Sequence, residues 1–586
     1  MRIGRSPSLL VPQPKFSLGL LSSRSSNPIR NTNTTTPEQT LAGAPPPPMA
    51  IAAIGAVSKT PFPLPLRRPP FLISARRRRT SSSSSPAAAA AAETLADPRA
   101  VDRPGTEGKG GGGGGGTPEW KMMSTKELGI KNSMITRSTR SVLEGLRKKG
   151  YEVYLVGGCV RDLILKKVPK DFDILTTADL REVKQTFSRC EIVGKRFPIC
   201  HVHINDSIVE VSSFSTFGRR TSHDLTCSSS RPPECDEHDY LRWRNCLRRD
   251  FTINGLMLDP YSSLVYDYFG GMEDLRKAKV RTVIPAHTSF QEDCARILRA
   301  IRIAARLGFR FSRETAQSLK DLATSVLRLD KGRLLMEMNY MLAYGSAEAS
   351  LRLLWRFGLL EVLLPIQAAY FVSQGFRRRD KRSNMLLALF SNLDRLLAPN
   401  RPCHSSLWVG VLALHQALVI EPRDPLAIAT FTLALHNGGD LSEAVNIARS
   451  INHPHDAKFP ELAEPRKWEK DGELVHEVRR LASSVQAALS LMTDEYSISQ
   501  AMARYPQAPY SDLVIVPLQV YLKVCRVFEC VDSRGRDASF HPKRVTKINY
   551  SSLGSGSLSE VRHVLARVVF DTVYPPSLEH DMKSPA

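Results

Sequence analysis

Two aspartates, Asp171 and Asp173, flank a single apolar residue. On a β-strand, residues i and i+2 point to the same face, so both carboxylates would face one side while Phe172 packs on the other. Paired carboxylates repel each other and cost stability unless divalent cations lie between them and a triphosphate. The spacing therefore indicates metal-dependent chemistry at a phosphate group.

A third carboxylate, Glu210, stands alone in the apolar run Ile208–Val211. If this run is a strand beside the aspartate pair, Glu210 would belong to the same cation site. The alternative is a glutamate on an edge strand that faces water. Because the aspartate pair is present, we favour a role in the site.

An apolar strand candidate ends in the pair Gly157-Gly158, and a short helix is expected to begin directly after it. Glycines let the backbone approach a phosphate closely, and a helix N-terminus offers free N–H groups to it. Most Gly-Gly pairs are ordinary turns. Because Asp171 and Asp173 follow shortly afterwards, we interpret this turn as a phosphate-binding element.

A small domain of strands and helices must position these residues. The pattern predicts strands at Tyr151–Val156, Phe172–Leu175 and Ile208–Val211, and helices at Ser133–Lys149 and Leu180–Phe187. From about Phe290 the spacing is helical, and beyond Val283 only Leu513–Val516 has the pattern of a strand. The helices expected there are Asp293–Leu307, Arg313–Val326, Lys331–Ala343 and Ser346–Phe357. The predicted fold class is α+β, with a small mixed sheet in the head and an extended all-α region after it.

The order of these motifs resembles that of the class II, polymerase β-type nucleotidyltransferases. Within that class, Gly157 to Asp162 resembles the opening motif of the bacterial poly(A) polymerases and tRNA CCA-adding enzymes. Further segments resemble this family in the required order. They are RRDFTIN (Arg248–Asn254), YDYFGGMEDL (Tyr266–Leu275), EDCARILRAIR (Glu292–Arg302) and LLWRFGLLEVLLP (Leu353–Pro365).

The resemblance implies an enzyme that extends RNA 3′ ends from ATP, with CTP as a further substrate if it adds CCA. It implies two Mg²⁺ ions, or Mn²⁺, held by Asp171, Asp173 and Glu210, with Asp250 as a further catalytic residue. It also implies a set of nucleotide-binding residues. They are Gly157, Gly158, Arg161, Arg249, Asn254, Asp293, Arg296 and Arg299.

The chemistry of the later motifs suits these roles. Arg249 offers a planar fork of donors to a phosphate, and Asp250 can accept a hydrogen bond from a ribose hydroxyl. On a helix, Asp293 and Arg296 would share one face and present an acceptor and a donor to a base edge. Arg299 would lie one turn further along, within reach of the triphosphate. The alternative for this helix is an amphipathic surface helix with an Asp–Arg ion pair.

One segment distinguishes the two enzymes of the family. Ile192–Ile204 resembles a signature of the bacterial poly(A) polymerases, and its Lys195-Arg196 pair could bind RNA phosphates. We therefore favour poly(A) polymerase over the CCA-adding enzyme. Gly255 and Ile303 depart from the family pattern, which leaves nucleotide selectivity open.

A different class of function is an RNA-binding protein that has lost catalysis on the same scaffold. The intact carboxylates argue against it, because clustered negative charge near phosphates does not help a binder. A nucleotidyltransferase acting on small molecules or proteins is disfavoured by the basic helical remainder.

The composition fits a nucleic-acid-binding protein of several domains. The chain has 586 residues and a net charge of +23, of which +13 remains in residues 118–586. This excess indicates a polyanionic partner. We expect a transit peptide and linker at 1–117, the head at 118–285, a helical nucleobase- and RNA-binding neck at 286–365, and a helical RNA-binding body at 366–586.

The first 117 residues have the composition of an organelle address. No acidic residue precedes Glu38 and none lies between Glu38 and Glu93, while Arg and Ser are abundant. This pattern is typical of import into a chloroplast or mitochondrion. Arg76–Arg79 could instead be a nuclear signal, which we favour less.

The remaining composition excludes other classes. The cysteines have no regular spacing, and the cluster Cys227, Cys235, His238 and Cys246 fits no zinc pattern. No stretch of about 18 apolar residues exists, so we expect no membrane span. We expect no obligate protein partner.

Overall fold

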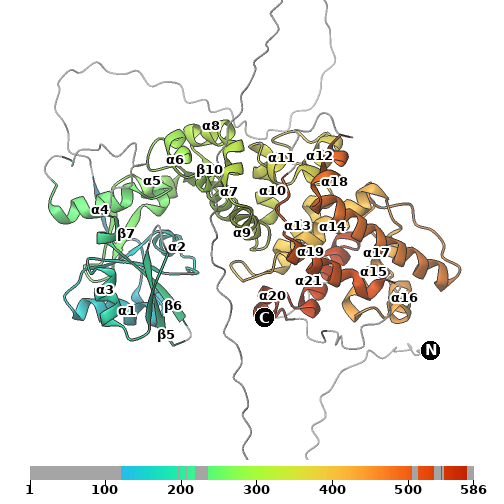
Figure 1. The fold of residues 1–586 in the computed structure, drawn as a ribbon, viewed down its shortest axis with the longest axis horizontal. Helices are drawn as coiled ribbons and strands as arrows, with labels where there is room; N and C mark the ends of the chain where they lie inside the picture. Colours follow the sequence, from blue (N-terminus) through green and yellow to red (C-terminus); the bar gives the residue numbers. More distant parts are fainter. Residues whose placement is uncertain are drawn as a thin grey trace, which may run out of the picture. The chain divides into compact units, whose positions relative to one another are not determined.

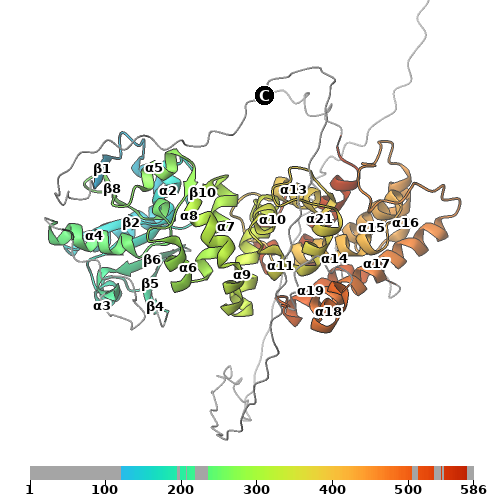
Figure 2. The same ribbon diagram turned by 90° about the horizontal axis from the view of Figure 1, so that it is seen from above.

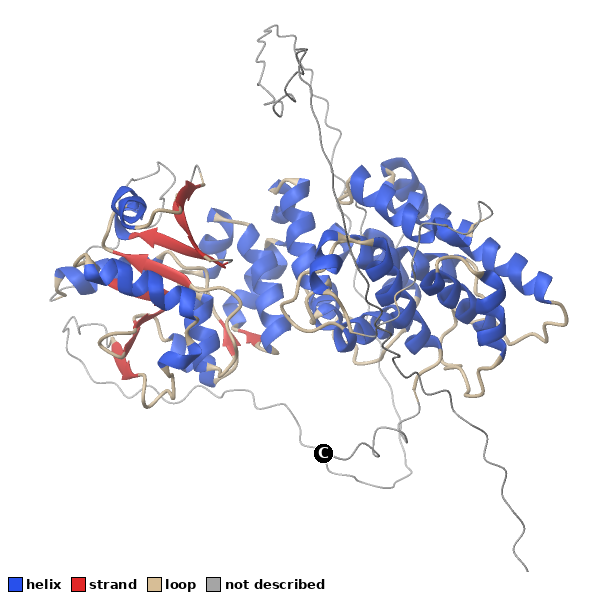
Figure 3. Cartoon of the chain, turned by 90° about the horizontal axis from the view of Figure 1, so that it is seen from below, coloured by secondary structure: helices blue, strands red, loops and turns tan. Residues whose placement is uncertain are grey.

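The computed structural model describes the chain from Trp120 to Pro576, apart from several short gaps. The described residues are 120–194, 198–205, 207–217, 232, 235–503, 513–532, 543 and 547–576. The expected transit segment 1–117, the Lys195-Arg196 pair and Cys227 lie outside them. Among the described residues, nearly all strands belong to the head, and the later chain is helical (Figure 3). The expected α+β class is confirmed.

The head is built on one eight-stranded mixed sheet. Its central strands β3 and β6 are parallel, and the other neighbouring pairs are antiparallel. This places the strand with Asp173 beside the strand with Glu210. In spatial order the strands are β1 (Lys121–Ser124), β8 (Leu264–Asp267), β7 (Leu256–Asp259), β2 (Val153–Val156), β3 (Asp173–Thr176), β6 (Ser207–Ser213), β5 (Ile199–Ile204) and β4 (Cys190–Val193).

Two helices pack against β5 and β6: α1 (Arg137–Lys148) and α3 (Leu180–Thr186) (Figure 1). Helix α1 begins later than the predicted Ser133 because Thr136 caps it, accepting a hydrogen bond from the Thr139 N–H. The short 3₁₀ turn η1 (Asn132–Met134) precedes it. The apolar stripe of α1 is buried, at Val142, Leu143 and Leu146.

A separate aromatic core lies around helix α4 (Glu237–Leu247), which follows the 3₁₀ turn η2 (Phe214–Phe217). Trp243 packs there with Tyr154 and Tyr266. The helix leads directly into the RRDFTIN segment, so this core fixes where that segment starts. Cys246 is buried in the same core, and among the described residues no group of three ligand side chains is arranged to hold a metal ion.

The RRDFTIN segment ends in the 3₁₀ turn η3 (Thr252–Asn254), which packs against helix α5 (Gly271–Arg276). After α5, strand β9 (Lys279–Val280) pairs in parallel with β10 (Arg310–Phe311). Strand β10 lies beyond Val283, so the prediction that Leu513–Val516 is the only strand in that part of the chain was wrong. Two-residue strands carry too few residues for an alternating pattern to show.

Between β9 and β10 the chain forms two helices, and further helices follow. The predicted helices are confirmed with shifted ends, and Arg313–Val326 is divided at Leu322. Helix α10 packs against α7 and α9, which gives this region a common core (Figure 2). The elements are α6 (Ala286–Glu292), α7 (Ala295–Leu307), α8 (Arg313–Asp321), η4 (Ala323–Arg328), α9 (Lys331–Leu342) and α10 (Ala347–Arg356).

The remaining helices enclose α14, whose side chains are buried almost all round. Helices α13, α14 and α15 all pack against α21, and α14 and α15 also pack against α17 (Figure 1). The elements are α11 (Leu360–Leu363), α12 (Pro365–Ser373), α13 (Met385–Leu396), α14 (Ser406–Ile420), α15 (Pro425–Asn437), α16 (Leu441–Arg449), α17 (Asp471–Thr493), α18 (Glu495–Met502), α19 (Leu518–Phe528), η5 (Glu529–Val531), α20 (Tyr550–Ser555) and α21 (Leu558–Val573). Within the described part of the chain, no helix has the length and apolar character to cross a membrane.

Leu513–Val516 is not a strand, contrary to the prediction. These residues are irregular, and Leu513, Ile515 and Val516 line a small apolar cavity together with Ile366 and Met492. Ile515 is only 4% exposed. The apolar run is therefore explained by burial between helices, since no strand of the described residues pairs with it to form a ladder.

A tight backbone contact joins η3 to α5. A Cβ atom added at Gly271 would lie 2.3 Å from the carbonyl oxygen of Thr252. We expect Gly271→Ala to lower the free energy of unfolding by about 1–3 kcal/mol, because backbone atoms would have to move. Urea unfolding followed by circular dichroism measures this. Gly472→Ala in α17 is the control, because nothing lies within 4 Å of its added Cβ; equal stability of the two variants would contradict the contact.

Candidate active site

The turn after β2 places the backbone of Gly157 close to the side chains of Arg249 and Asp173. Gly157 has a φ of +79°, a conformation that side chains other than glycine rarely adopt. A Cβ atom there would lie 3.3 Å from Asp173 Oδ2 and 3.5 Å from Arg249 Nη1. The prediction that glycine lets the backbone approach the site closely fits this geometry. Gly158 begins α2 (Gly158–Ile164), and a Cβ at Gly158 would contact the guanidinium of Arg161.

Asp173 and Glu210 lie side by side on the parallel strands β3 and β6, where they are direct register partners. The expectation that Glu210 stands on a neighbouring strand is confirmed. The side chain of Glu210 is half exposed, and its Oε1 lies 3.9 Å from His201 Nε2 on β5. The acidic pair therefore combines a partly buried carboxylate, Asp173, with a more exposed one, Glu210, in the middle of the sheet.

Asp171 does not share the strand of Asp173, contrary to the prediction. Strand β3 begins at Asp173, opposite Val156, and β2 leaves the sheet immediately afterwards at Gly157. Residues 171–172 therefore have no partner on that side with which to continue the ladder. Phe172 is buried as expected, but the Asp171 side chain is 66% exposed and its Oδ2 lies 3.4 Å from Lys170 Nζ.

The environment of Asp173 is unfavourable for its charge. Burial raises the pKa of Asp173 to about 6; Arg249 lowers it, while Glu210 and Asp171 raise it further. The three carboxylates therefore lie close enough to repel one another. A divalent cation would remove this electrostatic repulsion. The repulsion among the three carboxylates is therefore the observation by which these residues fit a metal site. Among the described residues, however, no three ligand side chains already converge on one point.

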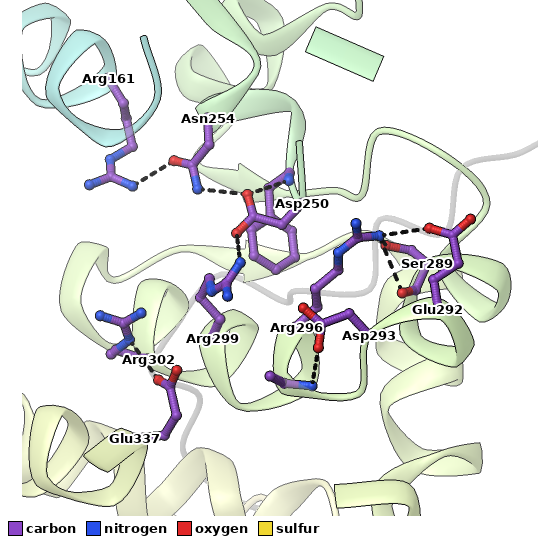
Figure 4. A network of polar contacts seen from close by, with 12 residues as sticks. Arg161, Asp250, Asn254, Ser289, Glu292, Asp293, Arg296, Arg299, Arg302 and Glu337 are labelled. Atoms are coloured by element: carbon purple, nitrogen blue, oxygen red, sulfur yellow. Dashed lines mark hydrogen bonds and ion pairs between the residues drawn. The ribbon is translucent and has the colours of Figure 1, made fainter. Parts of the chain in front are cut away.

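A chain of hydrogen bonds connects α2, η3 and α7 (Figure 4). Arg161 Nη1 donates to Asn254 Oδ1 at 2.7 Å, and Asn254 Nδ2 donates to Asp250 Oδ1 at 3.0 Å. Arg299 Nη1 donates to Asp250 Oδ2 at 3.0 Å. Three predicted nucleotide-binding residues and the predicted catalytic residue Asp250 thus form one network, which connects three separate motifs of the sequence.

Asp250 is buried yet remains charged. Burial alone raises the pKa of Asp250, but Arg299, Asn254 and the Phe251 N–H together outweigh it, and the pKa is lowered. These donors occupy three of the roughly four acceptor positions of the carboxylate, which leaves room for about one further donor such as a ribose hydroxyl.

Asp293 and Arg296 do not share a helix face, contrary to the prediction. Asp293 lies between α6 and α7 in an extended conformation, and its Oδ1 accepts from the Ala295 N–H at 3.0 Å (Figure 4). The short polar side chain of Asp293 thus caps α7 instead of continuing it. Arg296 Nη1 donates to Ser289 Oγ at 2.9 Å and pairs with Glu292 at 3.2 Å.

Four residues near the site were not predicted. Asn245 is 3% exposed, and its Oδ1 accepts from Arg249 Nη2 at 3.3 Å, which helps to direct Arg249 toward Asp173. Its spacing of four residues from Arg249 was the available signal. His201 lies opposite Glu210 across the pair of adjacent strands β5 and β6. The ion pair of Arg302 with Glu337, at 3.3 Å, joins α7 to α9, and no local pattern could have indicated it.

The comparisons with known proteins define the class of this head. Residues 153–281 match the family described as "Poly A polymerase head domain". Residues 308–371 match "Probable RNA and SrmB-binding site of polymerase A". The head therefore has the nucleotidyltransferase fold of the poly A polymerase head domain, and the segment after it is similar to a probable RNA-binding site of polymerase A.

The relatives include both enzymes of the family. Poly(A) polymerase I of Haemophilus influenzae is 35% identical over 247 residues, which are 41% of this chain and 54% of that protein. The CCA-adding enzyme of Geobacillus stearothermophilus is 33% identical over 37% of this chain and 52% of that protein. The crystal structure of the Bacillus stearothermophilus CCA-adding enzyme with CTP aligns at 23% identity and a TM-score of 0.38, over 67% of this chain and 91% of that chain. This chain spans about half the length of the curated relatives it matches.

The raised pKa of Asp173 predicts a stability change with a defined pH dependence. Above a pH of about 6 the native carboxylate is ionised against its preference, so it destabilises the fold relative to the unfolded chain. We expect Asp173→Asn to stabilise the metal-free protein by about 2 kcal/mol at neutral pH. The gain should shrink as the pH falls through about 6. Urea unfolding in a chelating buffer across this range measures it.

The control is Asp171→Asn, because the exposed side chain of Asp171 has little burial cost to relieve. Added Mg²⁺ should raise the stability of the wild type and not that of Asp173→Asn. A destabilised Asp173→Asn protein at neutral pH would disprove this account of the site.

Proposed function

We propose that this protein is a template-independent RNA 3′-end nucleotidyltransferase, and that it is a poly(A) polymerase adding AMP from ATP. The observation that carries the proposal is the pairing of Asp173 with Glu210 beside Gly157 and Arg249, in a head of the poly(A) polymerase type. The homology to poly(A) polymerase I and to CCA-adding enzymes supports the reaction class.

Each side chain has a task in this proposal. Asp171, Asp173 and Glu210 hold Mg²⁺, or Mn²⁺, which supplies activation of the RNA 3′-hydroxyl and neutralisation of the leaving pyrophosphate when bound. Arg249 and the backbone at Gly157 bind the triphosphate of ATP. Asp250 accepts from the ribose, held in place by Asn254 and Arg299.

Base selection is assigned to the segment that begins α7. One carboxylate oxygen of Asp293 accepts from the Ala295 N–H, and the other oxygen is left for a ligand. Arg296 Nη1 donates to Ser289 and Glu292. In this proposal Arg296 donates its remaining N–H groups to the adenine edge, and Asp293 accepts from it. Arg299 uses one N–H for Asp250, which leaves other donors for the triphosphate.

The alternative is a tRNA CCA-adding enzyme. The relatives alone do not separate the two activities, because both occur among them at similar identity. The resemblance of Ile192–Ile204 to poly(A) polymerases supports our choice, with Lys195 and Arg196 as RNA contacts. An inactive RNA-binding protein is a weaker alternative, since the buried charge of Asp173 stabilises nothing in the absence of a cation.

A nucleotide-addition assay tests the function. With Mg²⁺ and a generic RNA, we expect long tails from ATP and little addition from CTP, while Asp171→Ala and Asp173→Ala should abolish incorporation. Activity of either variant within about tenfold of the wild type would contradict the metal mechanism. A trimmed tRNA is the comparison substrate. Precise addition of CC and then A, restricted to tRNA, would replace our choice by the alternative.

We further propose import into a chloroplast or mitochondrion. The support is the acid-poor, Arg- and Ser-rich composition of residues 1–117. A fluorescent reporter fused behind these residues should enter one of these organelles. A reporter without them is the control, and retention of the fusion in the cytosol or nucleus would disprove the proposal.

A further inference from the structure

The carboxylates of the candidate active site have two different surroundings. Asp173 is largely buried, next to Gly157 and under the influence of Arg249. Asp171 is exposed and lies beside Lys170. In the proposed reaction, the triphosphate and the RNA 3′-hydroxyl must reach the metal site from different directions, because attack and departure are in line. The Asp173 side carries the residues for the triphosphate, which leaves the Asp171 side for the RNA.

The last arginine of α7, Arg306, lies within electrostatic range of Asp171. The carboxylates of Asp162 and Asp171 lie close enough to Arg306 to act on its charge. The guanidinium groups of Arg161 and Arg302 act on it as well. Among the described residues, Arg306 has no hydrogen bond or ion pair, whereas Arg302 pairs with Glu337. Burial lowers the pKa of Arg306, Asp162 and Asp171 raise it, and Arg161 and Arg302 lower it, so that the net shift is downward. The fold therefore holds a partly buried positive charge here whose N–H donors are not used by the described residues.

An aromatic ring from another helix lies in the same place. Lys170 Nζ lies 5.7 Å from the ring centre of Tyr340 on α9, and Arg302 Cζ lies 5.1 Å from it. The ring is partly exposed, and no hydrogen bond of its hydroxyl occurs among the described residues. Tyr344 packs on it at 5.1 Å between ring centres. A partly exposed ring among cations is the usual combination for binding single-stranded nucleic acid, since bases stack on the ring and phosphates meet the cations.

We propose that Lys170, Arg306 and Tyr340 bind the 3′-terminal nucleotides of the acceptor RNA and hold its end beside Asp171. This inference rests on the proposed function and assigns its second substrate to these residues. Lys170 and Arg306 contact the phosphates of the last nucleotides, and a terminal base stacks on Tyr340. An acidic peptide would use the two cations but not the ring, which favours RNA as the ligand.

Binding of a short, 5′-labelled oligoadenylate to the full chain, without nucleotide or metal, tests the site apart from catalysis. We expect Tyr340→Ala to weaken RNA binding about tenfold, while Tyr340→Phe restores it because the ring remains. Arg306→Ala and Lys170→Ala should each reduce the slope of log K against log salt by about 0.7, the value for one phosphate contact on a single strand. Tyr340→Ala should leave that slope unchanged.

Arg313→Ala is the matched control, because Arg313 is an exposed arginine at the start of α8. It should keep both the wild-type affinity and the wild-type slope. In steady-state assays of Arg306→Ala, the KM for RNA should rise while the KM for ATP stays constant. Equal binding by Tyr340→Ala and Tyr340→Phe, or an unchanged slope in Arg306→Ala, would overturn the acceptor site. A wild type that binds RNA in this manner but adds no nucleotide would instead overturn the proposed function.

Discussion

The arrangement of the site depends on one buried carboxylate. Asp250 comes from the head, and Arg299, which neutralises it, comes from α7. A buried charge that loses its partner costs several kcal/mol, roughly 3–5 in measured cases. This pair therefore keeps α7 at a fixed position against the RRDFTIN segment. Asn254 and Arg161 extend the same network to α2, which begins directly after Gly157.

The cluster around Asp173 has the opposite character. There the fold holds carboxylates together without enough positive charge, and the raised pKa of Asp173 measures the cost. Arg249 compensates only in part. The two carboxylates thus differ in their surroundings. Asp250 accepts hydrogen bonds from protein donors and fixes the position of α7, whereas Asp173 lacks enough neighbouring positive charge and is suited to bind a cation.

The sequence predicted the elements better than the contacts between them. The strand with Glu210 and the glycine turn could be identified because period and residue type are local signals. The predictions that placed Asp171 on a strand and Asp293 on a helix were wrong for a common reason: each pattern was extended past the residue where the backbone leaves its element. Strand β2 ends at Val156, opposite Asp173, so it offers no partner to Asp171, and the Asp293 side chain accepts from the Ala295 N–H at the start of α7.

Contacts between side chains were harder to derive from one sequence. Asn245 is four residues from Arg249, which is a weak local signal, and the structure shows that its amide oxygen accepts from that arginine. Tyr340 and Lys170 are 170 residues apart, and their proximity depends on how α9 packs against α7. Contacts of this kind depend on tertiary packing, which no periodicity records.

The small parallel pair β9–β10 has a consequence for how the molecule can move. It joins Lys279–Val280 to Arg310–Phe311, so the chain from 281 to 309, including α6 and α7, is a closed loop with both ends fastened at one place. The arginines of α7 are therefore tied to β9 and to the segment Tyr266–Leu275 that precedes it. In the proposed reaction, a movement that admits a new nucleotide would bend the chain outside this loop, and the segment assigned to base selection would keep its shape.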